Sequence, residues 1–125
     1  MSITSIAGKL FVPRQKELQQ YQNGAEELQD EVLKYLVNTA ASTEYGRNHL
    51  FKTIHSYEDF AKNVPLNTYE ELKGDIDRMR HGESDVLWPG SVKWYAKSSG
   101  TTNDKSKFIP VSHDGLQHVH SQGGK

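Results

Sequence analysis

The sequence predicts an α/β fold, more strictly an α+β fragment, in which helices come first and a strand–loop–strand unit follows. Two observations lead to this prediction. Up to residue 80 the apolar residues recur at intervals of three and four, and from residue 92 they alternate with polar residues, as in a strand. We therefore predict a mainly helical segment over residues 1–91 and the start of a β unit over residues 92–125.

The longest predicted helix runs from Pro13 to about Thr39. Its apolar residues share one face: Leu18, Tyr21, Ala25, Leu28, Val32, Tyr35 and Leu36. Pro13 suits the first turn of a helix, whereas the pair Asn23-Gly24 is expected to kink the helix or split it in two. The apolar face fits either a helical bundle or simple packing on a larger domain.

Local signals predict two shorter helices after the long one. Gly46 is expected to end a short helix within TEYGRNH, because glycine readily takes the left-handed conformation that follows many helices. Ser56, with Asp59 close behind it, predicts the start of the next helix. The pre-proline residue Val64 predicts where that helix ends.

The next predicted helix has about three turns and ends at Arg80. Its apolar residues are spaced for one face: Leu72, Ile76 and Met79. Two capping boxes are possible at its start, Asn67 with Glu70 or Thr68 with Glu71, and the sequence leaves this choice open.

Two short strands are predicted in the last third of the chain. Residues 92–97 alternate between apolar and polar side chains, and residues 107–111 form a short apolar run that we expect Pro110 to stop. Ser112 is a candidate cap for a last helix.

The segment between these strands has an unusual composition. It begins with five small or hydroxylated residues in a row: Ser98, Ser99, Gly100, Thr101 and Thr102. Small side chains let several backbone N–H groups and hydroxyls meet one anion, and Lys107 supplies the positive charge that amides lack. A plain hairpin turn has a similar composition, so the loop chemistry alone leaves both interpretations open. The spacing does not match G-x-x-x-x-G-K-[ST], which argues against a P-loop ATPase.

The composition limits the possible functions. The 125 residues carry a formal net charge of −1 and include no cysteine. A near-neutral chain has no overall field that attracts nucleic acid or an anionic membrane, and without cysteine there is no disulfide, zinc–thiolate site or thiol nucleophile. Because the sequence shows neither a secretory signal nor a membrane-spanning run, we expect a cytoplasmic protein.

The histidines near the end of the chain do not predict a metal site. On a helix His118 and His120 would face different sides, and on a strand they would share a face without a third ligand beside His113. No residue of this chain is a credible nucleophile or general base. We therefore predict no metal ligand and no catalytic residue.

A resemblance decides between the two interpretations of the loop. The stretch KSSGTTNDKSKFIPVS resembles the first ATP/AMP-binding motif of the adenylate-forming acyl-acid amido synthetases, the auxin-responsive-promoter family, in a bacterial-type form. The residues in register with that motif are Ser98, Ser99, Gly100, Thr101, Thr102, Lys107 and Pro110. Upstream phrases such as TEYGRNH and VLWPGSVKWYAKSSGTT are also similar, so the resemblance covers about residues 25–125. Asp104 stands where the family commonly has glycine.

The resemblance implies an ATP-dependent ligase. A carboxylic acid attacks the α-phosphate of Mg-ATP to give an acyl-adenylate and pyrophosphate, and the amine of an amino acid then displaces AMP. The matching residues imply that Lys107 counters phosphate charge and that five residues cradle phosphate: Ser98, Ser99, Gly100, Thr101 and Thr102. ATP and Mg²⁺ are the implied cofactors, and a small carboxylic acid and an amino acid are the implied substrates. Members of the family are much longer, so we expect an N-terminal fragment that is inactive by itself. Residues 1–91 and 92–125 are then both expected to be parts of one incomplete, larger N-terminal domain.

Two other functions stay open from the sequence. The first is a non-catalytic interaction module whose long helix, residues 13–39, docks on a partner chain. The second is a related adenylating enzyme of the acyl-CoA ligase type that shares only the loop. The upstream phrases argue against the second alternative, and the loop composition argues against the first.

Overall fold

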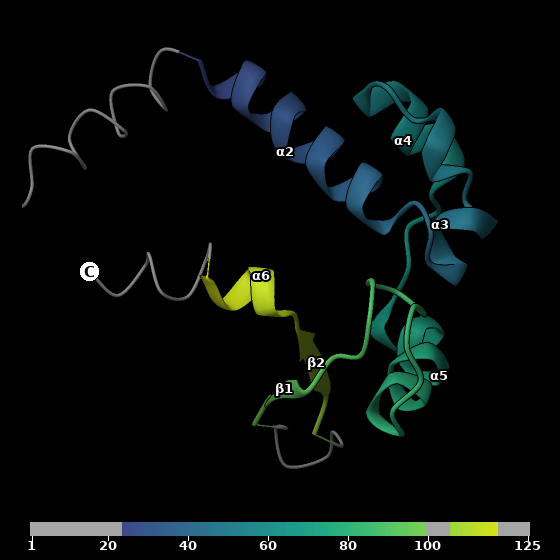
Figure 1. Cartoon of the computed structure of the whole chain (residues 1–125), viewed down its shortest axis with the longest axis vertical. Helices are drawn as coiled ribbons and strands as arrows, with labels where there is room; N and C mark the ends of the chain where they lie inside the picture. Colours follow the sequence, from purple (N-terminus) through teal and green to yellow (C-terminus); the bar gives the residue numbers. More distant parts are fainter. Residues whose placement is uncertain (1–23, 100–105, 118–125) are drawn as a thin grey trace, which may run out of the picture.

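The fold is given by a computed structural model, which describes residues 24–99 and 106–117. Three helices, α2, α3 and α4, lie together at one end of the molecule, and α5 lies beside a two-stranded sheet at the other end (Figure 1). Helices followed by a β hairpin confirm the predicted α/β class. In chain order the elements are α2 (Ala25–Ala40), α3 (Glu44–Asn48), the 3-10 helix η1 (Phe51–Thr53), α4 (Tyr57–Asn63), α5 (Tyr69–Arg80), β1 (Trp94–Lys97), β2 (Phe108–Val111) and α6 (His113–Gly115).

Helix α2 confirms the predicted long helix from Ala25 onward, with Gly24 as its N-cap. Residues 13–23 of that prediction lie outside the described residues. The face that packs inward is not the predicted one, because Val37 and Ala40 are buried in a cluster with Phe51 and Ile54. Three residues of the predicted face are instead exposed: Val32, Tyr35 and Leu36. Helix α2 is therefore apolar on two neighbouring faces, and the described residues cover one of them.

The prediction that Gly46 ends a helix is wrong. Gly46 is buried in the middle of α3, where the helix crosses the end of α2. A Cβ atom placed on Gly46 would lie 2.0 Å from the carbonyl oxygen of Ala40. The residue is glycine because the two backbones approach closely, not because the chain turns left-handed there.

Side-chain caps set the starts of α4 and α5. The Ser56 hydroxyl accepts a hydrogen bond from the N–H of Asp59, as predicted, and α4 ends before Val64. At α5 the capping pair is Thr68 with Glu71, whose carboxylate accepts from the Thr68 N–H at 2.6 Å and from its hydroxyl at 2.8 Å. The alternative cap, Asn67, instead donates its side-chain amide to the Tyr45 hydroxyl and to the Pro65 carbonyl: these contacts hold it outside the helix.

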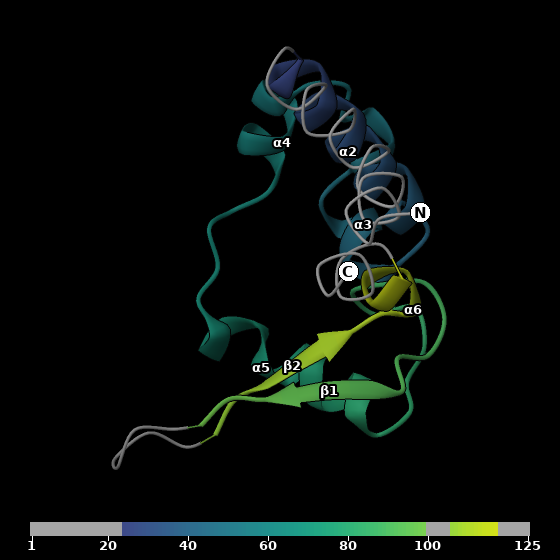
Figure 2. The same ribbon diagram turned by 90° about the vertical axis from the view of Figure 1, so that its left-hand side faces the viewer.

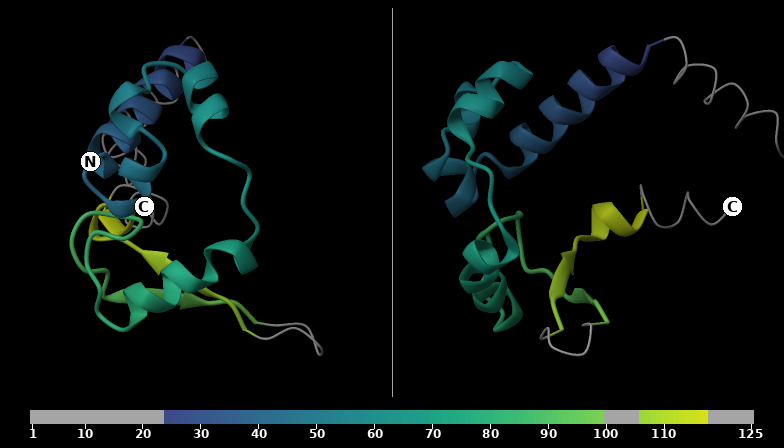
Figure 3. Two further views of the ribbon diagram at one scale, coloured as in Figure 1. Left: turned by 90° about the vertical axis from the view of Figure 1, so that its right-hand side faces the viewer. Right: turned by 180° about the vertical axis from the view of Figure 1, so that it is seen from behind.

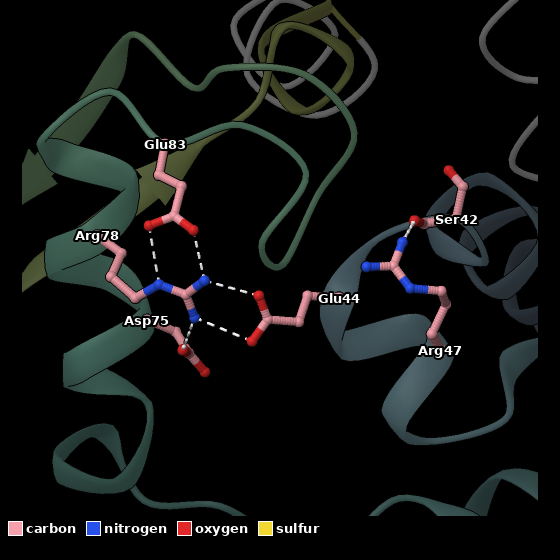
Figure 4. A network of polar contacts seen from close by, with 6 residues as sticks. All are labelled: Ser42, Glu44, Arg47, Asp75, Arg78 and Glu83. Carbon is pink, nitrogen blue, oxygen red and sulfur yellow. Dashed lines mark hydrogen bonds and ion pairs between the residues drawn. The ribbon is translucent and has the colours of Figure 1, made fainter.

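An ion-pair network joins α5 to α3 through Arg78 (Figure 4). Its guanidinium donates to both carboxylate oxygens of Glu44, at 3.0 and 2.6 Å, and its Nε donates to Glu83 at 2.9 Å. Asp75, one turn before Arg78, accepts a further bond at 3.1 Å. Hydrogen bonds from Arg78 lower the pKa values of Glu44 and Glu83. The carboxylates in turn keep the pKa of the Arg78 guanidinium above its ordinary range.

This network predicts a pH-dependent contribution to stability. A carboxylate with a lowered pKa stabilises the folded state above its unfolded pKa, and that stabilisation is lost as the pH falls through the folded value. We expect Arg78→Gln to lower the thermal midpoint at neutral pH, and the difference from the parent to shrink below the ordinary glutamate value of 4.5. Melting curves at neutral and acidic pH measure this. Lys73→Gln, on the same helix, is the control and should show no such pH dependence, and a pH-independent effect of Arg78→Gln would contradict the role of the carboxylates.

The two strands form an antiparallel hairpin with Tyr95 opposite Pro110 and Lys97 opposite Phe108. Figures 2 and 3 show α5 lying across one face of this hairpin. Side chains alternate between the faces, and the pairs 95/110 and 97/108 point towards α5, since Arg80 of α5 stacks on the ring of Phe108. The opposite face is apolar, and two of its residues, Trp94 and Ile109, are about half exposed.

The prediction that Pro110 stops the second strand is wrong, because Pro110 lies inside β2. Ser98 donates its N–H to the Lys107 carbonyl, which makes that pair a hydrogen-bonded one. Hydrogen-bonded and non-hydrogen-bonded pairs alternate along an antiparallel ladder, so Tyr95 and Pro110 form a non-hydrogen-bonded pair. The nitrogen of Pro110 therefore faces away from β1, where a missing N–H costs no ladder bond.

A second apolar cluster connects α5 to the hairpin. Met79 of α5 is buried with Val86 and Val92, and Tyr95 of β1 packs against them. Trp88 contacts this cluster and also the first one around α2, so it links the two ends of the molecule. Val92 is buried but precedes the strand, which begins two residues later than predicted. None of the helices in the described part of the chain has the length and apolar character to cross a membrane.

Candidate functional site

The candidate site is the end of the hairpin, where the chain leaves β1 at Ser98 and enters β2 from Lys107. The Ser98 N–H donates to the Lys107 carbonyl at 2.9 Å, and the Lys107 N–H donates to the Ser98 hydroxyl oxygen at 3.1 Å. The backbones of two predicted site residues are thus held directly together. Ser99 follows as an exposed residue, and the other predicted residues, Gly100, Thr101 and Thr102, lie outside the described residues.

The Ser98 hydroxyl has two roles available to it. Its oxygen accepts the Lys107 N–H and closes the base of the loop. A hydroxyl that accepts one hydrogen bond can still donate its own proton. The proton of Ser98 can therefore be offered to an anion above the loop base while the oxygen holds the two strands together.

Tyr69, the first residue of α5, also contacts the base of the loop. Its hydroxyl accepts the N–H of Phe108 at 3.0 Å, and its ring centroid lies 5.5 Å from the ammonium nitrogen of Lys107. The sequence analysis did not identify Tyr69, which lies 38 positions before Lys107. No local pattern connects the two residues, and only the packing of α5 on the hairpin brings them together.

The last residue of α5 contacts the same strand. The guanidinium carbon of Arg80 lies 3.7 Å from the centre of the Phe108 ring, and Arg80 also pairs with Asp77 at 3.1 Å. The two ends of α5 therefore both contact the residue that follows Lys107. This arrangement holds the start of β2 against α5.

A second polar region lies beside α6, away from the loop base. The rings of His113 and Trp94 lie near each other at a tilt of 33°, with their centres 6.4 Å apart. Both residues line an open cavity of about 370 Å³ together with Lys93 and Asp114. His118 and His120 lie outside the described residues. Within residues 24–99 and 106–117, no three or more His, Asp or Glu side chains gather as metal ligands would.

Comparison with known proteins identifies the family. Residues 14–123 match the model of the GH3 family N-terminal domain. The chain belongs to the GH3 family. This match confirms the family resemblance described above and covers both the helical part and the hairpin with its loop.

Curated GH3 relatives are amido synthetases and related ligases. Over 101 residues the chain is 34% identical to indole-3-acetic acid-amido synthetase GH3.15 of Arabidopsis thaliana. This alignment covers 80% of this chain and 17% of the relative. Over 106 residues it is 30% identical to 4-substituted benzoates-glutamate ligase GH3.12 of the same plant, covering 84% of this chain and 18% of the relative. The chain thus spans less than a fifth of the length of these GH3 relatives.

A solved GH3 structure has the same fold over most of this chain. It is the acyl acid amido synthetase AtGH3.15 in complex with 2,4-DB, with a TM-score of 0.69 and 33% sequence identity. The match covers 78% of this chain and 17% of that one. The helices and hairpin described here therefore correspond to a region of a GH3 synthetase.

Proposed function

We propose that this chain forms the N-terminal part of an ATP-dependent acyl acid amido synthetase. Membership in the GH3 family carries the proposal, and the closed loop base with Ser98 and Lys107 supports it. In the proposed reaction a carboxylate oxygen attacks the α-phosphorus of ATP, and pyrophosphate leaves to give an acyl-adenylate. The amine of an amino acid then attacks the acyl carbon, and AMP leaves as the amide forms.

The loop residues act on the phosphates and take no covalent part in either step. Phosphoryl chemistry of this kind depends on positioning and on stabilisation of developing charge. Lys107 supplies the positive charge at the loop base. The five preceding site residues supply hydroxyl and backbone N–H donors: Ser98, Ser99, Gly100, Thr101 and Thr102. None of these groups needs to act as a general base.

The donor set of the loop fits the phosphates of ATP. Hydroxyl, amide and ammonium groups are donors that suit the oxygens of a triphosphate. Mg²⁺ is commonly held through substrate phosphates with one or two carboxylates, so we propose that it arrives with the nucleotide. Bound with the nucleotide, it would supply further positive charge to the phosphates.

The proposal also covers the domain to which the chain belongs and its place in the cell. Residues 1–91 and 92–125 are proposed to belong to one larger domain that works in the cytoplasm. Among the described residues, the exposed apolar residues of α2, such as Val32 and Tyr35, support the interaction-module alternative. The acyl-CoA ligase alternative does not account for the GH3 match over residues 14–123.

An exchange assay tests the proposed function. The complete polypeptide that carries these residues should exchange pyrophosphate into ATP only when a carboxylic acid is present, and should release AMP when an amino acid is added. Indole-3-acetate, 4-substituted benzoates and 2,4-DB are suitable first acids, and residues 1–125 alone should show no exchange. Release of ADP and phosphate would contradict the adenylate route, and formation of a CoA thioester in place of an amide would favour the acyl-CoA ligase alternative.

A further inference from the structure

We propose that Tyr69 is a positioning residue that holds Lys107 in place for the nucleotide phosphates. The inference rests on the proposed function and adds to it a residue from a distant part of the chain. Tyr69 acts on Lys107 in two ways, through the backbone of Phe108 and through the side chain of Lys107 itself.

The backbone contact fixes the position of the main chain at Lys107. The N–H of Phe108 points away from β1, because the pair Lys97–Phe108 is a non-hydrogen-bonded one next to the hydrogen-bonded pair Ser98–Lys107. The Tyr69 hydroxyl accepts this N–H at 3.0 Å. Lys107 is therefore held from both sides, by Ser98 across the hairpin and by Tyr69 through its neighbour.

The ring contact influences where the Lys107 ammonium lies. Its nitrogen is 5.5 Å from the centre of the Tyr69 ring, inside the range of about 6 Å in which a cation is attracted to an aromatic face. This attraction is weaker than a charge-assisted hydrogen bond to phosphate. The ring can thus guide the free lysine side chain without competing with the nucleotide.

The position of Tyr69 is itself well determined. It follows the N-cap Thr68, whose N–H and hydroxyl both donate to Glu71 and so define the first turn of α5. At the other end of α5, Arg80 stacks on Phe108. The tyrosine therefore stands on a helix that is held at both ends, which a positioning role requires.

The test is a double-mutant cycle in the complete synthetase. Tyr69→Leu removes both contacts, and Tyr69→Phe removes the hydroxyl bond and keeps the ring. Each is made in the parent and in the Lys107→Ala background, and KM for ATP and kcat are measured by pyrophosphate exchange. We expect Tyr69→Leu to raise KM for ATP by roughly three- to tenfold and Tyr69→Phe by about two- to threefold, with little change in kcat. In the Lys107→Ala background each Tyr69 substitution should raise KM for ATP by less than about twofold.

Controls separate this role from simple loss of stability. Tyr57 is also the first residue of its helix, α4, and is exposed, so Tyr57→Leu should leave KM for ATP unchanged. If the Tyr69→Leu variant does not fold, Tyr69→Phe in the parent and in the Lys107→Ala background tests the inference by itself. Equal effects of the Tyr69 variants with and without Lys107, or no effect in the parent, would overturn the inference while leaving the proposed function in place. An unchanged KM for Lys107→Ala alone would overturn the phosphate role and the inference together.

Discussion

Replacing Gly46 with alanine is expected to lower the free energy of unfolding by about 3 kcal/mol, the upper end of what overpacking usually costs. The added Cβ would lie 2.0 Å from the carbonyl oxygen of Ala40, 2.9 Å from its carbonyl carbon and 3.1 Å from the Cα of Ala41. All three are backbone atoms, so no side chain can rotate away to make room. Helix α3 and the end of α2 would have to separate.

That separation would break several hydrogen bonds around Gly46. The Thr43 hydroxyl, which is fully buried, donates to the Ala40 carbonyl at 2.7 Å and accepts the Gly46 N–H at 2.9 Å. The two residues after Thr43 also donate hydrogen bonds: the N–H groups of Glu44 and Tyr45 donate to the carbonyls of residues 85 and 86. A shift of α3 would leave buried donors and acceptors without partners, which adds to the steric cost.

Urea unfolding followed by circular dichroism measures this effect. Gly74→Ala is a matched control, because Gly74 lies in α5 and a Cβ there would meet no atom within 4 Å. Alanine in an open helix position should stabilise by about 0.5–1 kcal/mol. Opposite signs at the two glycines would support the close-approach explanation, whereas two similar small changes would show that α2 and α3 can adjust.

Replacing Lys107 with alanine is expected to raise KM for ATP by roughly ten- to a hundredfold. A charge-assisted hydrogen bond to phosphate contributes about 1.5–3 kcal/mol, and the variant loses it without disturbing the backbone contacts of Lys107 with Ser98. The affinity for the carboxylic acid should change much less, because the proposed contact is with phosphate. Pyrophosphate exchange at varied ATP and acid concentrations separates the two effects.

Lys62→Ala is the control for general loss of positive charge. Lys62 is exposed in the last turn of α4, and α4 lies at the end of the molecule away from the hairpin (Figure 1). Its removal should leave KM for ATP unchanged. An equal rise in both lysine variants would point to a long-range charge effect, and no rise for Lys107→Ala would contradict its assignment to phosphate.

Local patterns predicted the order and type of the elements well, because caps and periodicity act over a few residues. The start of α4 at Ser56 and the Thr68–Glu71 capping box follow from neighbouring side chains. Gly46 and Pro110 were misjudged because their roles depend on another segment: Ala40 for Gly46 and the hydrogen-bonding phase of β1 for Pro110. A glycine or proline marks a special backbone position, but sequence alone does not say whether a turn or a neighbour requires it.

The same limit applies to the candidate site. Ser98 and Lys107 could be predicted because a motif contains them, and the structure brings them into contact. Tyr69 could not, because the residues that it contacts are 38 and 39 positions away. On α2, periodicity identified an apolar face, but an inward face at Val37 and Ala40 lies beside it. Which face is covered depends on where the rest of the structure lies.

Tyr69 and Pro110 together determine which edge of the small sheet can pair with a further strand. Along β2, the two N–H positions that point outward belong to Phe108 and Pro110: one is taken by the Tyr69 hydroxyl and the other does not exist. A further strand arriving at the outer edge of β2 would find carbonyl acceptors there but no free N–H donor. On β1 the outward positions are Tyr95 and Lys97, both with an N–H. Any strand that widens this sheet is therefore directed to β1.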